Sequence, residues 1–372
     1  MTSQRRVHSI GPYAVGEPLK PRAARVLPSK HHLLRWFIHC TRLNGSVFSV
    51  GWLLILWVFV PACSRPNATD DTKPRFAFVV NVPADRYWDI AYAGCLQAAS
   101  EENVTVEFHA PNEATAQQQK QIVESLMSRG LDGLAITPLN PESLTAVLNQ
   151  AAEMFPVICQ DSDASESNRV CYIGTDNVEL GRQMGEMMKQ ALPAGGKVAI
   201  FVGQLDVANA KERQQGVFEA IEGSKLEVIG TFTDGGQPAE AKRVATDVLS
   251  KYVDLKGIIG LWGYNGPQAV NALEGSPERE VKVVGSDESV ETMRGIRLGR
   301  QVGSVAQQPF EFGYQSIKLL AKLQRGETVN LPENKIITID TYTITSENCD
   351  EVEQAIAAKL ELLKEHLQRQ EN

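Results

Sequence analysis

The sequence predicts an α/β protein built from two lobes, each a parallel sheet covered by helices on both faces, and three observations support this. Short apolar runs alternate with segments of helical periodicity from residue 75 to about residue 290, as in parallel sheets covered by helices. The strands are too many for one sheet, and 372 residues suit two lobes of ordinary domain size. Several apolar runs end in polar side chains, and ligands of such sheets bind at the carboxyl ends of the strands.

In the first half of the chain, short apolar runs typical of strands alternate regularly with segments of helical periodicity. Each apolar run is long enough for a buried strand and too short for a helix. Gly130 is expected at the C′ position of one helix, and Pro141 opens the next. We therefore expect strands at 75–82, 104–110, 131–138 and 156–160, and helices at 87–103, 114–130 and 141–154.

The second half repeats the pattern and then ends differently. We expect helices at 177–192, 208–223, 238–252 and 265–275, and strands at 197–203, 226–233, 257–263 and 281–287. The segment 346–372 is predicted to be a separate C-terminal helix. Docking of this helix on a lobe is the preferred interpretation, and binding of a partner or of a second copy is the alternative. Its apolar face comprises Val352, Ile356, Leu360, Leu363 and Leu367.

The N-terminal segment 1–62 has the pattern of an export signal. Its first 45 residues hold eight Lys or Arg against one acid, and residues 47–62 are apolar apart from Ser49. That apolar stretch is short for a membrane span of about 20 residues. The polar segment 63–74 then resembles a tether. An uncleaved membrane anchor is the alternative, and both interpretations place the folded part outside the cytoplasmic membrane.

The folded part is acidic. From Cys63 onward the chain has 37 − 8 = 29 basic residues and 45 − 1 = 44 acidic residues, a net charge of −15. A body with this charge repels phosphate backbones, so nucleic acid is not expected as a partner.

Neither the cysteines nor any known catalytic motif indicates a metal site or an enzymatic reaction. The six cysteines include no CxxC pair, so they match no metal template. Cys159 and Cys171 lie on adjacent predicted strands, where they either form a disulfide or act as small buried hydrophobes. No GxSxG elbow, HExxH motif or P-loop is present, so we expect neither an enzyme nor a cofactor.

Polar side chains at the strand ends predict a binding site for a small polar molecule. Asp161 and Asp163 follow one apolar run, Asn265 follows another, and Asp287 follows a third. A carboxylate accepts hydrogen bonds and an amide both donates and accepts them, which suits a ligand covered in hydroxyl groups.

Residues from about 75 to 345 resemble the periplasmic sugar-binding proteins of the ribose-binding type, the solute receptors of bacterial ABC importers. The resemblance rests on the order and spacing of FVVN, QIVESLMSRGLDGLAITP, PVICQDSD, YIGTDN, ANAKERQQGV, LWGYNG, VVGSDE and VGSVAQQP. It implies two Rossmann-like lobes with parallel sheets joined by a three-crossover hinge, a periplasmic binding protein fold of type I. The N-terminal lobe would comprise 75–175 and 308–336, and the C-terminal lobe 176–307 and 337–345.

The resemblance also implies function. It predicts a monomeric receptor that binds a monosaccharide or polyol between its lobes and delivers it to an ABC permease in the membrane. The segment Val60-Pro61-Ala62-Cys63 resembles a bacterial lipobox, which implies lipidation at Cys63 and a location in the cell envelope. A sugar sensor that presents its closed form to a membrane kinase or chemoreceptor is the alternative. An exported sugar-modifying enzyme is less favoured, and the export signal excludes a transcriptional repressor.

The site residues implied by the resemblance come from both lobes. They are Asn81, Asp85, Tyr87, Trp88, Thr137, Asp161, Arg213, Asn265, Asp287 and Gln307. An aromatic face would cover the C–H side of the sugar ring, although Tyr87 or Trp88 could instead be core. Thr137 could be a strand-end hydroxyl without a ligand, and Gln307 a hinge residue with backbone duty only.

Each remaining site residue also has a purely structural interpretation. Arg213 could form a surface salt bridge, and Asn265 and Asp287 could cap the helices that follow them. The chain departs from the family at Ser162, where an Arg is common, and Asp163 would then compensate or cap the loop. Where ribose binders have an aromatic group after TFTD, this chain has Gly235 and Gly236, which implies a roomier pocket.

Overall fold

Two six-stranded sheets organise the computed structural model, which describes residues 73–82 and 86–371. The sheet orders are β11-β5-β4-β3-β1-β2 and β12-β10-β9-β8-β6-β7. The predicted α/β class with two parallel sheets is confirmed, apart from β12, which runs antiparallel to β10. The predicted export segment 1–62, the tether 63–74 up to Thr72, and the lipidation site Cys63 lie outside the described residues.

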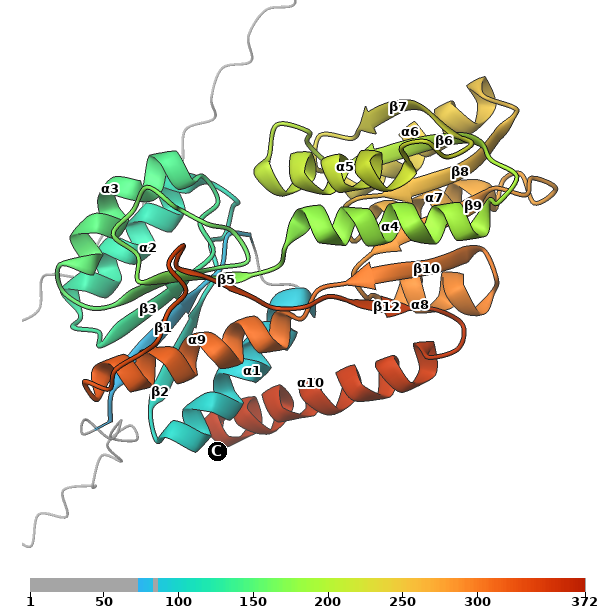
Figure 1. Ribbon diagram of the computed structural model, residues 1–372. Coiled ribbons are helices and arrows are strands. Elements are labelled where there is room, and N and C mark those ends of the chain that lie inside the picture. Colours follow the sequence, from blue (N-terminus) through green and yellow to red (C-terminus); the bar gives the residue numbers. More distant parts are fainter. Residues whose placement is uncertain (1–72, 83–85, 372) are drawn as a thin grey trace, which may run out of the picture. The chain divides into compact units, whose positions relative to one another are not determined.

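The N-terminal lobe has helices on both faces of its sheet (Figure 1). Phe76 and Phe78 of β1 point toward α1 and α9, whereas Ala77 and Val79 point toward α2 and α3. This alternation follows from the two-residue period of a strand. The strands are β1 (Arg75–Val79), β2 (Thr105–His109), β3 (Gly133–Ile136), β4 (Val157–Gln160), β5 (Cys171–Gly174) and β11 (Ile336–Thr338). The helices are α1 (Arg86–Glu102), α2 (Ala116–Ser128), α3 (Pro141–Ala152) and α9 (Pro309–Gln324).

The C-terminal lobe repeats this arrangement. Helices α4 and α5 pack on one face of its sheet, and α6 and α7 pack on the other. The strands are β6 (Gly196–Val202), β7 (Leu226–Thr233), β8 (Leu255–Gly260), β9 (Lys282–Ser286), β10 (Gln301–Ala306) and β12 (Tyr342–Ile344). The helices are α4 (Asn177–Ala191), α5 (Ala208–Ile221), α6 (Pro238–Lys251), α7 (Asn265–Leu273) and α8 (Val290–Arg297).

Between the sheets, the chain passes at three places: from β5 to α4, from β10 to α9 and from β11 to β12. The predicted three-crossover connection is therefore present in the described residues. The residue limits given above for each lobe remain predictions.

Local signals in the sequence begin and end the helices as expected. Asn140 caps α3 by accepting the Ser143 N–H at 2.8 Å, and Pro141 occupies its first turn. After α2, Gly130 has a φ of +71°, which suits a glycine at C′.

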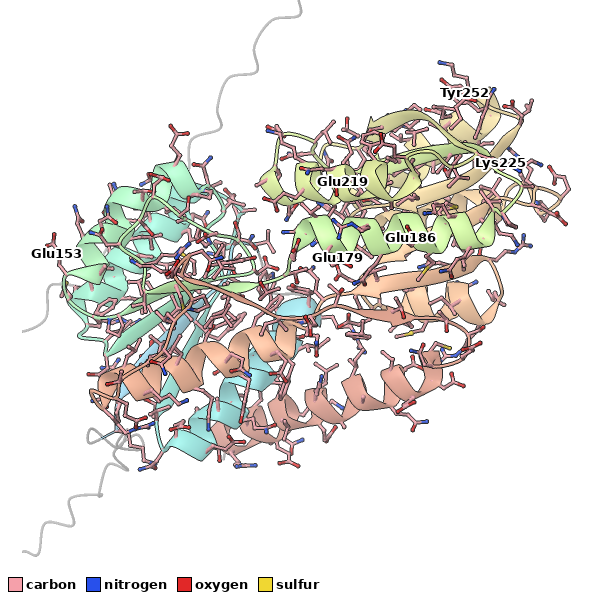
Figure 2. The ribbon with its side chains drawn as sticks, viewed as in Figure 1. Glu153, Glu179, Glu186, Glu219, Lys225 and Tyr252 are labelled. Atoms are coloured by element: carbon pink, nitrogen blue, oxygen red, sulfur yellow. The ribbon has the colours of Figure 1, made fainter. Side chains whose placement is uncertain are left out.

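A dense set of charged pairs covers the outer surface of α4 and α5. Figure 2 labels Glu179 and Glu186 on α4 and Glu219 on α5. Arg182 pairs with both Glu179 and Glu219, and Lys189 pairs with Glu186 at 2.7 Å. Such exposed pairs contribute little stability each, about 0–1 kcal/mol, and mark this face as solvated.

The cysteines Cys159 and Cys171 are free thiols, so the disulfide interpretation is wrong. In the register of β4 and β5, Cys171 pairs with Ile158 and Cys159 pairs with Tyr172. The two thiols therefore point to opposite faces of the sheet, and Cys159 packs toward α2 and α3 while Cys171 packs toward α1 and α9. Both are buried, as small hydrophobes would be.

The predicted C-terminal helix is α10 (Cys349–Glu371), and it is docked as preferred. Its apolar side packs at Val352, Ile356, Leu360 and Leu363, while Leu367 is 48% exposed. Across the described ranges, no helix has the length and apolar character needed to span a membrane.

Candidate functional site

Asp161 and Asp287 occupy equivalent positions in the two lobes. Each follows the fourth strand from its sheet's β2 or β7 edge, β4 for Asp161 and β9 for Asp287. Their φ angles are +60° and +58°, a left-handed conformation that is uncommon outside glycine and that short polar residues tolerate best. The next strand accepts each backbone N–H at 3.0 Å, through Ile173 O and Val305 O. The same strained turn thus places a carboxylate at the carboxyl end of each sheet, as the sequence predicted.

Tyr87 contacts one of these carboxylates and lies in the electrostatic field of the other. Its hydroxyl donates to Asp161 Oδ1 at 2.7 Å. Burial raises the pKa of Tyr87 well above its usual value, and the negative charges of Asp161 and Asp287 add to that increase. Because Asp287 belongs to the other lobe, its effect places both carboxylates in the electrostatic environment of one ring.

The neighbouring Trp88 belongs to the core instead. It is 4% exposed and packs with Phe76 and Phe78 against the sheet. Its ring meets the Tyr87 ring edge-on, with centroids 4.9 Å apart. Tyr87 is only half-buried, so it is the aromatic residue available to a ligand, and Trp88 supports it from behind.

The hinge segment that follows β10 holds the Asp287 carboxylate in place. Gln307 donates both its backbone N–H, at 3.3 Å, and its Nε2, at 3.1 Å, to Asp287 Oδ1. Ser286 Oγ donates to Oδ2 at 3.4 Å. Gln307 therefore lies beside Asp287 and fixes the orientation of its carboxylate.

Arg213 is a buried residue of α5 and not part of a surface salt bridge. It is 4% exposed, its Nε donates to Asn177 Oδ1 at 2.9 Å, and its Nη1 donates to Leu261 O at 2.9 Å. Within the described residues, Nη2 has no partner. This position depends on Gly181 of α4, where a Cβ would lie 1.9 Å from Arg213 O. The close approach of α4 and α5 thus sets the place of the guanidinium.

Two other predicted residues are committed to internal contacts. Thr137 is fully buried, and its Oγ1 accepts a hydrogen bond from Gln160 Nε2. Asn265 is 2% exposed, its Oδ1 accepts the Trp262 N–H at 3.0 Å, and its Nδ2 donates to Asp234 Oδ2 at 2.9 Å. The bond of Thr137 matches the interpretation as a strand-end hydroxyl. Asn265 does not cap the helix that follows, because α7 begins at Asn265 and has no side-chain cap hydrogen bond.

Of the positions considered from the sequence, Asn81, Asp85 and Asp163 remain. Asn81 follows β1 and is half-buried, and Asp85 lies outside the described residues. Asp163 neither compensates for Ser162 nor caps its loop, because both of its oxygens accept hydrogen bonds from Arg169, whose side chain is only 5% exposed. The carboxylate of Asp163 is therefore neutralised within its own lobe.

Sequence reasoning missed an aromatic and acidic cluster in the C-terminal lobe. Asp234 Oδ1 accepts the Tyr264 hydroxyl at 2.7 Å and the Gly236 N–H at 3.0 Å. Trp262 Nε1 donates to Asn209 Oδ1 at 3.2 Å. The available signal was the LWGYN segment, whose two aromatic residues follow β8 directly.

The backbone conformation explains why glycines occupy positions 235 and 236. Gly236 has a φ of +79°, and a Cβ there would meet no atom closer than 3.9 Å. The pair therefore forms the turn that Asp234 closes, and the nearest ring, Trp262, is 4.0 Å from the position of that Cβ. An aromatic side chain from the segment after β8 thus lies near the place where the family's aromatic group was expected.

Taken together, these side chains suit a neutral ligand with many hydroxyl groups. Carboxylates on two lobes accept hydrogen bonds, a buried guanidinium donates them, and one phenol ring lies between. No group of three His, Cys, Asp or Glu able to hold a metal ion occurs in the described part of the chain. The fold and the site define a two-lobed binding protein for a small polar solute.

The chain belongs to the periplasmic binding protein domain family, whose model matches residues 76–328. The family is one of binding proteins and not of enzymes. This chain is similar to the D-allose-binding periplasmic protein of Escherichia coli K12, with 26% identity over 73% of this chain and 92% of that protein. The ribose import binding protein of Haemophilus influenzae is 28% identical over 56% of this chain and 71% of that protein.

Solved structures agree with these relatives. A solute binding protein of Burkholderia graminis in complex with D-arabinose superposes with a TM-score of 0.70 at 29% identity, covering 75% of this chain and 98% of that one. The XylFII-LytSN complex gives a TM-score of 0.67 at 26% identity, with 74% and 98% covered. The resemblance to periplasmic sugar-binding proteins of the ribose-binding type is thereby confirmed.

Proposed function

We propose that this protein is an extracytoplasmic receptor that binds a monosaccharide or related polyol between its two lobes for an ABC-type importer. The observation that carries the proposal is the convergence on Tyr87. Asp161 of one lobe accepts its hydroxyl, and the charge of Asp287 from the other lobe acts on the same ring. A ligand covered in hydroxyl groups would replace these contacts with its own.

In this proposal each lobe contributes part of the site. Asp161 and the ring of Tyr87 would receive the sugar in the open form, with the ring against its C–H face. Asp287, oriented by Gln307, and the free Nη2 of Arg213 would reach it as the hinge closes. Hydrogen bonds to charged groups contribute about 1.5–3 kcal/mol each, so a few of them support micromolar affinity, about −8 kcal/mol, after ordering costs.

The delivery step belongs to the same proposal. The closed form would present a surface to a membrane permease, and lipidation at Cys63 would keep the receptor beside it in the cell envelope. The proposal rests here on the family and on the similarity to an import binding protein.

A sugar sensor is the second candidate function. A specific observation favours it, because a structural relative is seen in the XylFII-LytSN complex. In that case the closed form would be recognised by a membrane kinase and not by a permease. A transporter operon beside the gene would favour import, and an adjacent histidine kinase gene would favour sensing.

The binding proposal is tested by thermal shift with a panel of monosaccharides and polyols. A ligand at one hundred times its dissociation constant adds about 2.7 kcal/mol of stability, which is readily seen as a rise in Tm. The shift should disappear in Asp161→Asn and in Asp287→Asn. It should persist in Asp247→Asn, a change to an exposed side chain of α6. A folded protein that responds to no member of the panel would refute a free monosaccharide as the ligand.

A further inference from the structure

The C-terminal helix α10 is attached to both lobes. Near its start, Arg297 of α8 donates to Asp350 Oδ1 at 2.8 Å and pairs with Glu353. Near its end, it lies against α1, where the rings of His366 and Tyr92 meet with centroids 6.2 Å apart. Figure 1 shows α10 running from α8 to α1. One helix thus contacts the C-terminal lobe with its first turns and the N-terminal lobe with its last.

Apolar contacts join the same three elements into one core. Ile90 and Ala93 of α1, Met293 and Ile296 of α8, and Ile356 of α10 belong to a single buried cluster. Ile356 is 4% exposed, so the helix is packed into the two lobes and not merely laid on them. Leu363 extends the contact, because it packs against this cluster and against the core of the N-terminal lobe.

The helix also lies directly behind the candidate site. Tyr87 and Asp287 point to the site, and their chain neighbours Arg86 and Glu288 line a small pocket with residues of α10 such as Glu353. Arg86 Nε and Glu288 Oε2 are buried there with no hydrogen-bond partner among the described residues. Each lobe therefore offers one residue to the site and the adjacent one to the region beneath α10.

We propose that α10 is a strap that holds the two lobes in the arrangement in which α1 and α8 share one buried core with α10. Open and closed forms of such proteins differ by only a few kcal/mol, so one helix fastened at both ends shifts their populations. The strap lies beyond residue 328, where the segment matched by the family model ends. Its effect on sugar affinity rests on the proposed function, whereas its effect on the lobes does not.

The test releases each end of the helix separately in the full chain, purified in detergent. Arg297→Ala removes the ion pairs to α10 at the C-terminal lobe, and Leu363→Ala removes packing at the N-terminal lobe. Leu362→Ala is the matched control, because this neighbouring leucine is 37% exposed. Spin labels on p-acetylphenylalanine placed at Glu153 and Lys225, one exposed position on each lobe (Figure 2), report the distance between the lobes by pulsed electron resonance.

A strap predicts non-additive results. Without sugar, Arg297→Ala and Leu363→Ala should each broaden the distance distribution. The double variant should resemble either single one, because the two attachments of a strap act in series and weakening one already loosens it. Sugar affinity should fall by about two- to five-fold in each case, the range expected for losing a modest surface contact.

Each outcome decides between the possibilities. Distances that match the wild type in both variants would overturn the strap and leave α10 as a docked helix. Additive changes would also overturn it, in favour of two independent local effects. Changed distances in a protein that binds no sugar would overturn the proposed function and keep the strap.

Discussion

Replacing Glu288 by glutamine should remove a large pH dependence from the stability of this protein. Burial raises the pKa of Glu288 to about 8, and the negative charge of Asp287 adds to the increase. The positive charges of Lys359 on α10 and Arg86 on α1 oppose it, while Glu353 of α10 lines the same pocket. The folded protein therefore binds a proton at this carboxyl group more tightly than the unfolded chain does.

The sign and the magnitude of the pH effect on stability follow from this difference in proton binding between the folded and unfolded states. The pKa of the Glu288 carboxyl group is near 4.5 in the unfolded chain and about 8 in the folded protein. Its contribution to the free energy of unfolding is therefore complete below pH 4.5 and is lost as the pH rises through 8. At 1.36 kcal/mol per pKa unit, the loss between pH 5 and pH 9 amounts to about 4 kcal/mol. Glutamine mimics the protonated acid and does not titrate. The variant should therefore resemble the wild type at pH 5 and exceed its stability at pH 9.

Urea unfolding followed by circular dichroism at pH 5, 7 and 9, without sugar, measures this effect as the difference between the two proteins. Glu291→Gln, which removes an exposed carboxylate of α8 three residues further along the chain, is the matched control. A Glu288→Gln variant whose stability follows the wild type in parallel at all three pH values would refute the reasoning. It would mean that the carboxyl group is solvated or already paired in solution.

Three further results are expected. Arg169→Met should destabilise the protein by about 1–3 kcal/mol in chemical unfolding, because it leaves the partly buried carboxylate of Asp163 without its partner. The double variant with Asp163→Asn should recover most of the loss, and equal losses in both would contradict this. Gly236→Ala should cost about 1–2 kcal/mol from its φ of +79° alone, since nothing obstructs the new Cβ, and an unchanged midpoint of unfolding would argue against that conformation. Mass spectrometry after alkylation in denaturant without reductant should find Cys159 and Cys171 both alkylated, and an unmodified linked pair would show the register of β4 and β5 to be different.

The sequence predicted the repeating part of the fold well because that part depends on local signals. The strand expected at 226–233 is β7 (Leu226–Thr233), and the helix expected at 177–192 is α4 (Asn177–Ala191). By contrast, no element was assigned to residues 288–345, where the structure has α8, β10 and α9. The same stretch holds β11 and β12, which have three residues each. So short a strand carries too few residues for a detectable period, and its pairing is decided by the sheet edge that it meets.

For the site, the sequence could place side chains at strand ends but could not choose their partners. Asp161, Thr137 and Asn265 all follow apolar runs and are alike in pattern. Thr137 and Asn265 are nevertheless consumed by bonds to Gln160 and to Asp234, residues that only the folded lobes bring near.

The two aspartates remain the best candidates for a reason visible only in three dimensions. Asp161 and Asp287 share a left-handed turn that costs about 1–3 kcal/mol at each position, and both act on Tyr87. A conformational cost that recurs at equivalent places in two lobes needs a common explanation. Presentation of a carboxylate toward one shared ligand provides it, because neither residue caps a helix: α8, the helix after Asp287, is capped by Ser289.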